Sequence, residues 1–385
     1  MKNILFLHVG AEMYGSDKVL YQIVTGLNPQ KYHPIVVLPE HGELENAMLQ
    51  AGIEVRVINY PIMRRKFFSI IGIFQYAISY LHYSGKLRKL LKECSIDLVY
   101  VNTIAVLEGV YLYLFSKTPV LWHIHEILTT PKAIYKFTSF LIGRFDNRVI
   151  AISNATKKHL IDSGFVKSDK VQIIYNGIDN VDVDITKNMR SELNISEDSF
   201  VFGHVGRVNV WKGQEDFLQA SIPLLKKYKK MHILFSGNAF PGEEWREEEL
   251  ISKINNNPDI RNRIHYLGYQ RNTDKIFETM DVFITSSTRP EPFSMVTIEA
   301  MNHSKPVIAY DVGGPAEIVE DKVTGLLSQF QNIDQLQKNM EFMITHPDVV
   351  TRMGENSKKR IDNNFSISKF NTQIDEICDK LITKN

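Results

Sequence analysis

Short apolar runs, each followed by a segment of helical periodicity, recur along the whole chain and restrict its fold more than any other feature. Strands that alternate with helices predict a parallel sheet, because each crossover helix returns the chain to the same edge. The first half contains seven such runs: ILFLHV (4–9), HPIVVLP (33–39), EVRVINY (54–60), DLVYVNT (97–103), PVLWHIH (119–125), RVIAIS (148–153) and KVQIIYN (170–176).

A second series of runs follows: FVFGHVGR (200–207), MHILFSG (231–237), IHYLGY (264–269), VFITSS (282–287), PVIAYD (306–311) and GLLSQF (325–330). The polar stretch between the two series predicts a domain boundary near residues 180–198. We therefore expect an α/β protein with two doubly wound, Rossmann-like parallel-sheet domains, residues 1–185 and 190–364. Ligands of open parallel sheets bind beyond the carboxyl ends of the strands, so the chemistry is expected in a central cleft that both domains face.

The charges of the 385 residues nearly balance, with 45 Lys and Arg against 44 Asp and Glu, but the two halves differ in sign. Residues 1–180 hold 20 basic and 14 acidic side chains, whereas residues 181–385 hold 25 and 30. This split argues against a nucleic-acid binder and permits an anionic partner for the first half. The two cysteines lack metal or disulfide spacing and the first apolar run is too short for a signal peptide, so a cytoplasmic protein is expected.

One segment departs from the alternation of strands and helices. Residues 64–83 carry three cations and then a long apolar and aromatic stretch, which falls short of the roughly 20 residues that span a bilayer. Two interpretations of residues 64–92 stay open. The stretch is either a helix packed on the sheet or an element at an anionic membrane surface, with its aromatic face in the lipid interface. The cations of the second interpretation are Arg64, Arg65, Lys66, Lys86, Arg88 and Lys89.

The strongest chemical signal is RPEPFSMVTIEAM (289–301), directly after an expected strand. Pro290 and Pro292 flank Glu291 and disfavour helix there, so Glu291 should lie on a rigid loop at the carboxyl end of a strand. The residues after it can begin a helix whose free N–H groups and positive dipole end suit a phosphate. Glu299 would lie one to two turns inside that helix, and both carboxylates can accept hydrogen bonds from sugar or ribose hydroxyls.

Three further strand ends carry candidate residues. In GHVGRVNVWKG (203–213), Arg207 and Lys212 follow a strand and together could reach one diphosphate. In GAEMYGSDKVL (10–20), Gly15 precedes an apolar-periodic helix for which Ser16 is the expected N-cap, and the glycine suits either a tight turn or a ligand contact.

The third is WHIHE (122–126), where two histidines alternate along the strand. Only one of them can then face the cleft, so a shared metal is not expected, and His125 is favoured because it lies closer to the strand's end. The acidic triplet DVD (182–184) lies in the polar stretch between the domains and has too few convergent oxygen ligands for a cation. We expect no metal and no cofactor.

Together these residues resemble the family 4, or group 1, retaining glycosyltransferases of the GT-B fold. The resemblance rests on the spacing from Glu291 to Glu299, on Arg207 with Lys212-Gly213, and on the WHIHE strand end. It also includes NGID (176–179), YDVGGPAEIVEDKVTGLL (310–327) and AISNATKKHLIDSGF (151–165), so it covers nearly the whole chain.

The resemblance implies a nucleoside diphosphate sugar bound by the second domain, an acceptor bound by the first, no required metal and retention of the anomeric configuration. It implies that the final helix, about 365–385, crosses back onto the first domain. Carried over by position, the cations hold the donor diphosphate, Glu291 binds sugar hydroxyls, Glu299 binds the ribose and His125 lies near the reacting sugar. The donor-binding set is Gly15, Arg207, Lys212, Glu291, Phe293, Ser294, Met295, Val296 and Glu299, and the catalytic pair is His125 and Glu291.

Two departures from the family pattern are visible. Ser294 stands where the family usually has glycine, which keeps the backbone contact but narrows the expected donor pocket. The usual Gly-Gly-Ala-Glu opening is stretched to GAEMYGSD, and Gly15 is chosen as the ligand contact because it directly precedes the helix.

The sequence therefore predicts a hexosyltransferase at the inner face of the membrane, acting on a lipid-linked acceptor of a surface glycan. Two alternatives remain: a GT-B transferase for a small soluble acceptor, and a sugar-nucleotide-binding subunit without turnover. A nicotinamide oxidoreductase is disfavoured because no G-x-G-x-x-G follows the first strand.

Overall fold

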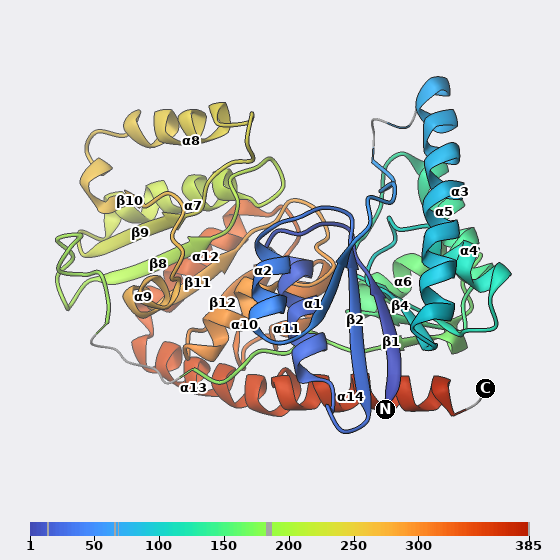
Figure 1. Ribbon diagram of the computed structural model, residues 1–385. Helices are drawn as coiled ribbons and strands as arrows, with labels where there is room; N and C mark the ends of the chain where they lie inside the picture. The colour runs from blue at the N-terminus through green and yellow to red at the C-terminus, as the bar shows by residue number, and fades with distance from the viewer. Residues whose placement is uncertain (14, 65–66, 68, 182–186, 384–385) are drawn as a thin grey trace. The chain divides into compact units, whose positions relative to one another are not determined.

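The computed structural model describes residues 1–13, 15–64, 67, 69–181 and 187–383 (Figure 1). The chain divides into two compact units. Unit 1 consists of Met1–Gly177 with Ile367–Asn385, and unit 2 of Ile178–Ser366. Each unit contains one parallel β-sheet, as the two series of apolar runs predict.

The sheet of unit 1 has seven parallel strands in the order β3-β2-β1-β4-β5-β6-β7. They are β1 (Lys2–Leu7), β2 (Tyr32–Leu38), β3 (Glu54–Val57), β4 (Ile96–Val101), β5 (Val120–Ile124), β6 (Arg148–Ala151) and β7 (Val171–Ile173). Each overlaps one of the seven expected runs. The order places β1 between β2 and β4, so the chain reverses its direction of winding at β1, where the first and the fourth strand end side by side.

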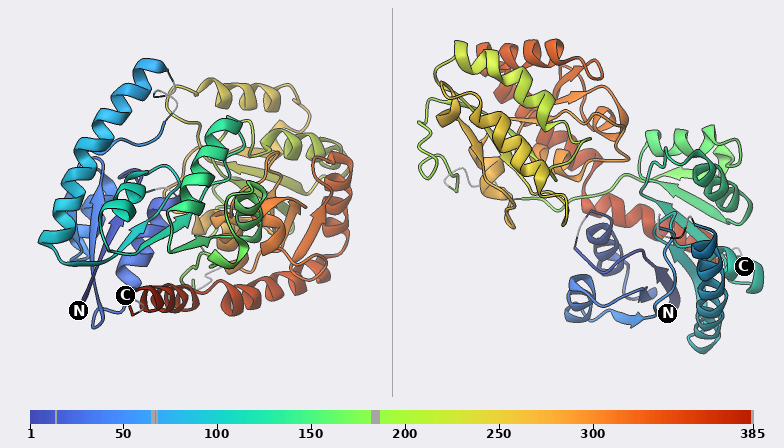
Figure 2. Two further views of the ribbon diagram at one scale, coloured as in Figure 1. Left: turned by 90° about the vertical axis from the view of Figure 1, so that its right-hand side faces the viewer. Right: turned by 90° about the horizontal axis from the view of Figure 1, so that it is seen from above.

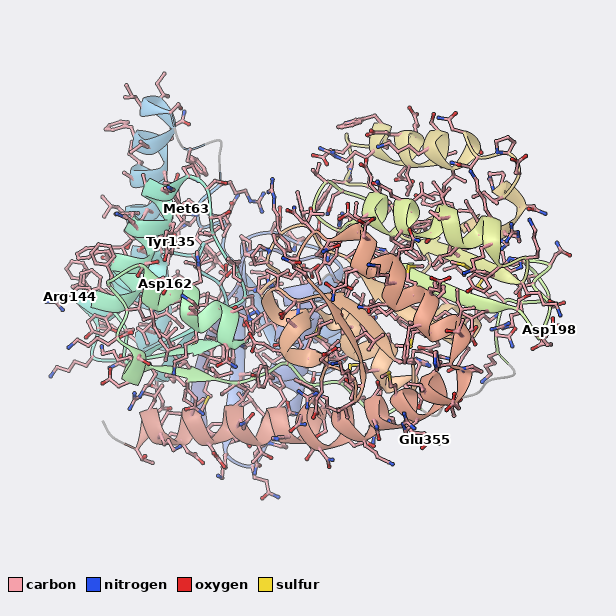
Figure 3. The ribbon with its side chains drawn as sticks, turned by 180° about the vertical axis from the view of Figure 1, so that it is seen from behind. Met63, Tyr135, Arg144, Asp162, Asp198 and Glu355 are labelled. Atoms are coloured by element: carbon pink, nitrogen blue, oxygen red, sulfur yellow. The ribbon has the colours of Figure 1, made fainter. Side chains whose placement is uncertain are left out.

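Helices cover both faces of this sheet, and the last helix of the chain is among them. They are α1 (Gly15–Gly26), α2 (Glu43–Gln50), α3 (Ile70–Glu93), α4 (Glu108–Phe115), α5 (Lys132–Arg144), α6 (Asn154–Asp162), the 3-10 turn η2 (Ser168–Lys170) and α14 (Ile367–Ile382). Helix α14 packs against α1 and β4. Asp379 of α14 accepts hydrogen bonds from Tyr32 and, at 2.9 Å, from Lys31. On the other face the Tyr135 hydroxyl of α5 donates to the His159 carbonyl of α6 at 2.6 Å, and Arg144 points outward (Figure 3).

The large apolar side chains of helix α3 are buried only in its second half. Leu87, Leu90 and Leu91 are at most 5% exposed, whereas Ile70 and Phe74 are 89% and 69% exposed. The first turns of α3 extend past the strand ends of unit 1 in Figure 1 and in the left view of Figure 2. The interpretation as a packed helix therefore describes the second half, whereas the first half packs through one side only, where the Tyr80 hydroxyl donates to the Leu107 carbonyl at 3.2 Å. Within the described residues, no helix has both the length and the apolar run that crossing a bilayer requires.

The sheet of unit 2 has six parallel strands in the order β10-β9-β8-β11-β12-β13. They are β8 (Phe200–Val205), β9 (Met231–Ser236), β10 (Ile264–Tyr266), β11 (Val282–Thr285), β12 (Val307–Tyr310) and β13 (Gly325–Ser328). Each again overlaps an expected run. The helical elements are α7 (Gln214–Lys227), α8 (Trp245–Asn255), η3 (Arg261–Arg263), α9 (Asp274–Thr279), α10 (Met295–Asn302), α11 (Gly313–Ile318), α12 (Ile333–Thr345) and α13 (Pro347–Asn364).

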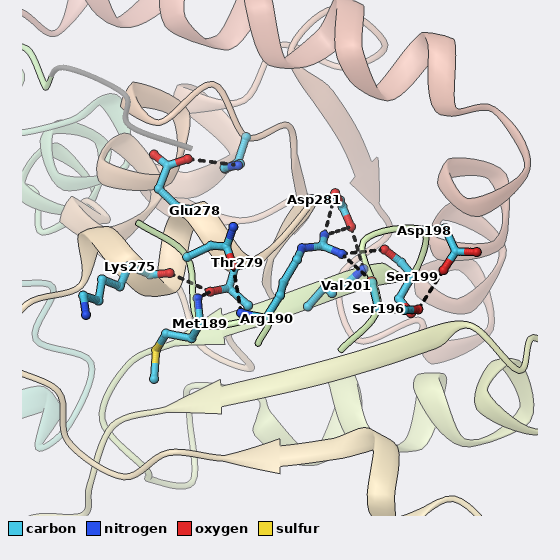
Figure 4. Close-up of polar contacts among 12 residues, drawn as sticks. Met189, Arg190, Ser196, Asp198, Ser199, Val201, Lys275, Glu278, Thr279 and Asp281 are labelled. Atoms are coloured by element: carbon cyan, nitrogen blue, oxygen red, sulfur yellow. Dashed lines mark hydrogen bonds and ion pairs between the residues drawn. The ribbon is translucent and has the colours of Figure 1, made fainter. Parts of the chain in front are cut away.

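Within the polar stretch before β8, the described residues from 187 onward belong to unit 2 and form hydrogen bonds inside it. The Arg190 guanidinium is buried and donates to both oxygens of Asp281, at 3.0 and 3.2 Å, and to the Ser199 carbonyl at 2.9 Å (Figure 4). The Met189 amide donates to Thr279. The chain passes from unit 1 to unit 2 at Gly177, earlier than the expected 180–198, because these polar groups form internal hydrogen bonds. The DVD triplet at 182–184 lies outside the described residues.

Candidate functional site

The expected cation Lys212 and the expected carboxylate Glu291 meet in unit 2. Lys212 Nζ lies 2.7 Å from Glu291 Oε2, and the two side chains are 22% and 10% exposed. The other carboxylate oxygen accepts a hydrogen bond from the Ser287 hydroxyl. Each carboxylate oxygen therefore has one partner and retains a lone pair that can accept a further hydrogen bond.

The loop that carries Lys212 is fixed by its own polar groups. Asn209 Oδ1 accepts from the backbone amides of Trp211 and Lys212, at 3.1 and 2.9 Å. His204 donates through Nε2 to the Lys212 carbonyl at 2.9 Å, and burial lowers the pKa of His204 to about 4, so this histidine is neutral at pH 7. Gly213 ends the loop at a φ of 75°, where a Cβ would lie 1.8 Å from the Ser286 carbonyl oxygen. Only glycine satisfies both the backbone angle and this close approach.

The loop that carries Glu291 is held against α11. The Gly314 amide donates to the Glu291 carbonyl at 2.8 Å. A Cβ on Gly313 would lie 2.7 Å from the same oxygen, and one on Gly314 would lie 2.6 Å from the Cα of Phe293. The motif DVGGPAE (311–317) therefore packs through its glycine backbone on the loop that carries Glu291. This contact fixes the position of Glu291.

Helix α10 begins at Met295, directly after this loop, as the sequence predicts. Among the described residues, the backbone amides of Met295 and Val296 have no hydrogen-bond partner. Ser294 is 2% exposed, and its hydroxyl accepts a hydrogen bond from Thr297 at 2.8 Å. Glu299 is half-buried, one turn inside the helix.

Arg207 follows β8, at the carboxyl edge of the unit 2 sheet. Its guanidinium carbon is 3.8 Å from the centre of the Phe240 ring, a cation–π contact. The Arg207 carbonyl accepts from Gln214 at 2.9 Å. The aromatic ring in this way restricts the orientation of a cation for which the sequence predicts a diphosphate contact.

In unit 1, the carboxyl ends of three neighbouring strands carry one polar residue each. His8, Asn102 and His125 are the first residues after β1, β4 and β5. His125 Nε2 lies 2.9 Å from Asn102 Oδ1, and Asn102 Nδ2 lies 3.2 Å from His8 Nδ1. His8 Nε2 in turn lies 2.6 Å from a carboxylate oxygen of Asp17 in α1. His125 is half-buried, whereas the other three residues are buried.

The two histidines of WHIHE do not lie on opposite sides of the sheet. Their ring centres are 4.1 Å apart, because β5 ends at Ile124 and His125 no longer follows the strand's alternation. His123 is fully buried, its Nδ1 is hydrogen-bonded to the Tyr100 hydroxyl at 2.8 Å, and it is a packing residue. Within the described residues, no group of three His, Cys, Asp or Glu side chains is arranged to hold a metal.

The expected N-cap of α1 is wrong. The helix begins at Gly15, so Ser16 lies inside its first turn and its carbonyl accepts a hydrogen bond from Asn102. A Cβ on Gly15 would meet no described atom within 4 Å, so the protein itself does not require glycine there. The ligand contact of Gly15 stays a prediction.

Sequence reasoning missed His8, Asp17, Asn102 and Ser287. A signal for two of them was present, because His8 and Asn102 each end an apolar run at a strand's carboxyl end. The strand order brings β1, β4 and β5 together, and this order is what makes the residues neighbours.

The two units match two parts of one enzyme family. The family described as "Glycosyl transferases group 1" matches residues 185–360, and "Glycosyltransferase Family 4" matches residues 13–181. The chain belongs to the group 1, family 4 glycosyltransferases.

Several characterised relatives are similar over part of their length. A UDP-Gal:alpha-D-GlcNAc-diphosphoundecaprenol alpha-1,3-galactosyltransferase of Escherichia coli is 26% identical over 65% of this chain and 64% of its own. A trehalose synthase of Pyrococcus horikoshii is 25% identical over 86% of this chain and 83% of its own. With other relatives the match is shorter, and the chain spans 56% of a glycosyltransferase of Methanocaldococcus jannaschii.

Among solved structures, Anabaena HepE in complex with UDP is 26% identical, with a TM-score of 0.85 over 99% of this chain and 100% of the other. The complex of HepE with UDP-glucose has a TM-score of 0.82 over the same shares. The fold of this chain is therefore the GT-B fold, with two parallel-sheet α/β units.

Proposed function

We propose that this protein is a retaining, metal-independent glycosyltransferase that moves a hexose from a nucleoside diphosphate sugar to a lipid-linked acceptor of a surface glycan. The observation that carries the proposal is the Lys212–Glu291 pair beside the free amides at the start of α10. A cation and helix N–H groups suit a diphosphate, and a carboxylate with open lone pairs suits sugar hydroxyls. The HepE complexes support UDP as the nucleotide.

Catalysis then needs charge stabilisation more than a protein nucleophile. The acceptor hydroxyl attacks the anomeric carbon on the face from which the diphosphate leaves, the carbon–oxygen bond to the phosphate breaks, and a phosphate oxygen takes the hydroxyl proton. Lys212 and Arg207 stabilise the negative charge that develops on the leaving group. These two cations supply the positive charge that a metal provides in other transferases, so turnover is expected to survive EDTA.

Donor binding is tested by thermal unfolding with UDP, GDP, ADP, dTDP and CMP. A ligand at 100 times its dissociation constant stabilises by about 2.7 kcal/mol, and we expect this shift with UDP for the wild type and its loss in Lys212→Ala. Lys226→Ala is the matched control, because Lys226 is an exposed lysine at the end of α7. An equal UDP shift in Lys212→Ala would refute the diphosphate role.

The acceptor proposal rests on helix α3. The exposed apolar side chains of its first half form one surface, which we call the α3 apolar surface: Ile70, Ile71, Ile73, Phe74, Ile78 and Leu81. Arg64 precedes it, and the exposed Lys86 and Lys89 follow it on the next turns. An apolar face bordered by cations is typical of helices that lie in the interface of anionic membranes.

Not every cation of this segment takes part. Arg88 is half-buried and lies 5.9 Å from the ring centre of Phe115, so it packs against α4 instead of facing lipid. Arg65 and Lys66 lie outside the described residues. The relative from Escherichia coli, which by its name uses a diphosphoundecaprenol acceptor, supports a lipid carrier.

Vesicle flotation tests the membrane part. The wild type should float with vesicles that contain anionic phosphatidylglycerol and not with neutral ones, and the double variant Ile73→Ser/Phe74→Ser should stay in solution. Leu49→Ser is the matched control, since Leu49 is an exposed apolar residue of α2 in the same unit. Wild type that fails to float at low salt would refute the membrane surface.

One observation favours the alternative of a small soluble acceptor. The likeness to the trehalose synthase covers 86% of this chain, more than the likeness to the galactosyltransferase. Transfer from UDP-glucose to a free sugar, but not to a polyprenyl diphosphate sugar, would select this alternative. Transfer to neither, with UDP binding intact, would select the binding subunit. The anomeric configuration of any product, determined by NMR, tests retention.

A further inference from the structure

The polar residues at the carboxyl edge of the unit 1 sheet form one continuous chain of hydrogen bonds. It begins at His125, passes through Asn102 and His8 and ends at Asp17. His8 is held from a second side, because its amide donates to the Tyr60 hydroxyl at 3.0 Å and that hydroxyl also contacts the His8 carbonyl. Three of the four members are buried, so water does not compete for their hydrogen bonds.

The direction of every bond in this chain follows from one carbonyl group. Asn102 Nδ2 lies 3.4 Å from the Ser16 carbonyl oxygen, which can only accept. The amide nitrogen of Asn102 must therefore face Ser16 and His8, and its oxygen must face His125. An amide oxygen only accepts, so His125 Nε2 carries a hydrogen, and His8 Nδ1 must be bare to accept from Asn102. His8 then carries its hydrogen on Nε2, which donates to Asp17.

We propose that Asp17, His8 and Asn102 are positioning residues that hold His125 in one neutral tautomer, with Nε2 protonated and Nδ1 able to accept a hydrogen bond from a sugar hydroxyl. Among the described residues, none is hydrogen-bonded to His125 Nδ1. The ring can neither donate from this atom nor act as an acid. It selects a hydroxyl, which can donate, over a carbonyl or phosphate oxygen, which cannot.

Burial keeps His125 neutral. The titratable groups near it are His123 on β5, Glu126 in the following loop and His8 after β1, with Asp17 of α1 behind His8. Burial, with His8 as a second cause, lowers the pKa of His125 to about 3. Burial raises the pKa of Glu126, although Thr103 and the His125 amide donate to its carboxylate. His125 should therefore not titrate between about pH 5 and 8, where an ordinary histidine does.

The tautomer is independent of the enzyme's activity, whereas the sugar hydroxyl rests on the function proposed above. The two parts are tested separately. Nitrogen-15 NMR of the histidine-labelled protein, with His125 assigned from His125→Gln, reports which ring nitrogen carries the hydrogen. We expect a bare Nδ1 and a protonated Nε2 that do not change across this pH range. A protonated Nδ1, or a titration midpoint near pH 6.5, would overturn the proposal.

Asp17, the residue of the hydrogen-bond chain that lies farthest from His125, gives the sharper test. An asparagine amide at position 17 can donate to His8 Nε2, and the hydrogen of His8 then moves to Nδ1. A protonated Nδ1 can no longer accept a hydrogen bond from Asn102 Nδ2. The preference for one His125 tautomer is then lost. Asp17→Asn should therefore change the NMR signals of His125, although three hydrogen bonds separate the two residues. It should also lower kcat at least tenfold, with a smaller change in KM for the donor. The control is Glu54→Gln, which removes a carboxylate 3.1 Å from His33 of the same unit.

A second variant guards against a failure of Asp17→Asn to fold. Asn102→Asp has the same shape but can only accept, and its charge favours a protonated His125. Its kcat should acquire a pH dependence that the wild type lacks, as His125 begins to titrate. Unchanged His125 signals in both variants would show that the chain of hydrogen bonds does not set the tautomer. Changed signals with unchanged kcat and KM would keep the positioning role and refute the contact with the sugar.

Discussion

The carboxyl edges of the two sheets differ in the charge of the side chains that they carry. In unit 2, Lys212 and Glu291 are both charged groups, and each is the partner of the other at 2.7 Å. In unit 1, the equivalent edge carries two histidines and an amide that are joined by hydrogen bonds, and burial keeps His125 neutral. The first edge is suited to a ligand that brings charge, and the second to a ligand that brings hydroxyl groups.

This difference assigns chemistry to each unit from local contacts alone. A diphosphate loses bound water when it binds, and cations already held in position offset the free energy of that dehydration. Sugar hydroxyls need acceptors of defined direction, and a neutral imidazole in one tautomer supplies them. If the comparison is right, changes at the unit 2 edge should act on nucleotide binding, and changes at the unit 1 edge on the sugar step.

The largest effect is expected from Gly213→Ala. The alanine Cβ would overlap the Ser286 carbonyl oxygen, and the backbone angle of 75° adds strain, so the loop that positions Lys212 must move. We expect a loss of at least about 3 kcal/mol of unfolding free energy and the loss of UDP binding. Chemical denaturation and UDP titration measure the two.

Gly52→Ala separates strain from overlap. Gly52 has a similar φ of 77°, but a Cβ there meets no atom within 4 Å, so only the backbone cost of about 1 kcal/mol is expected. Similar losses in both variants would mean that the close approach of Gly213 to Ser286 does not fix the Lys212 loop.

The next largest effect concerns the carboxylate of unit 2. Glu291→Gln keeps the shape of the side chain but removes the charge that Lys212 and Ser287 contact. We expect kcat to fall about 100-fold, because an acceptor of sugar hydroxyls is lost, while UDP still binds through Lys212. A variant with full kcat would show that a neutral group suffices at this edge too, and the contrast between the units would disappear.

The sequence predicts one side of this contrast better than the other. All thirteen strands follow from apolar runs, since burial in a parallel sheet demands such runs at each strand. Lys212 and Glu291 also follow, because glycine and proline mark their loops. The hydrogen-bond chain from His125 to Asp17 does not, since His8, Asn102 and His125 are far apart in sequence and meet only through the strand order β1-β4-β5. The sequence left open whether the first half of α3 is exposed, because an apolar helix can have the same composition in a core.

A third effect distinguishes the interiors of the units by their response to pH. Glu108 in unit 1 is fully buried, neither carboxylate oxygen has a partner among the described residues, and burial raises its pKa from 4.5 to about 8. Between these values the native state holds a proton that the unfolded state has lost. The contribution of Glu108 to the free energy of unfolding is therefore fully present below about pH 4.5. It falls by about 1.4 kcal/mol per pH unit as the pH rises to about 8.

Glu108→Gln removes this contribution to the slope. Measured by denaturant titration from pH 5 to 8, the unfolding free energy of the wild type should fall relative to that of Glu108→Gln at about that rate as the pH rises. The contrast is Asp281 of unit 2, where burial also raises the pKa but the charge of Arg190, at 3.0 Å, opposes that rise. Parallel pH curves for the wild type and Glu108→Gln would mean that Glu108 ionises freely in the native protein.

The smallest effect is expected at Ser294, where the resemblance to the family predicts a narrower donor pocket. In the structure the Ser294 side chain is buried and its hydroxyl is hydrogen-bonded to Thr297 inside α10, so it lies within the helix packing. Ser294→Gly should cost about 1 kcal/mol of stability through the lost hydrogen bond. The affinity for UDP, measured by calorimetry, should change less than about fivefold, because the amides of Met295 and Val296 and the charge of Lys212 remain. A tenfold or greater gain in affinity would mean that steric fit limits donor binding at the unit 2 edge, so that charge alone does not describe it.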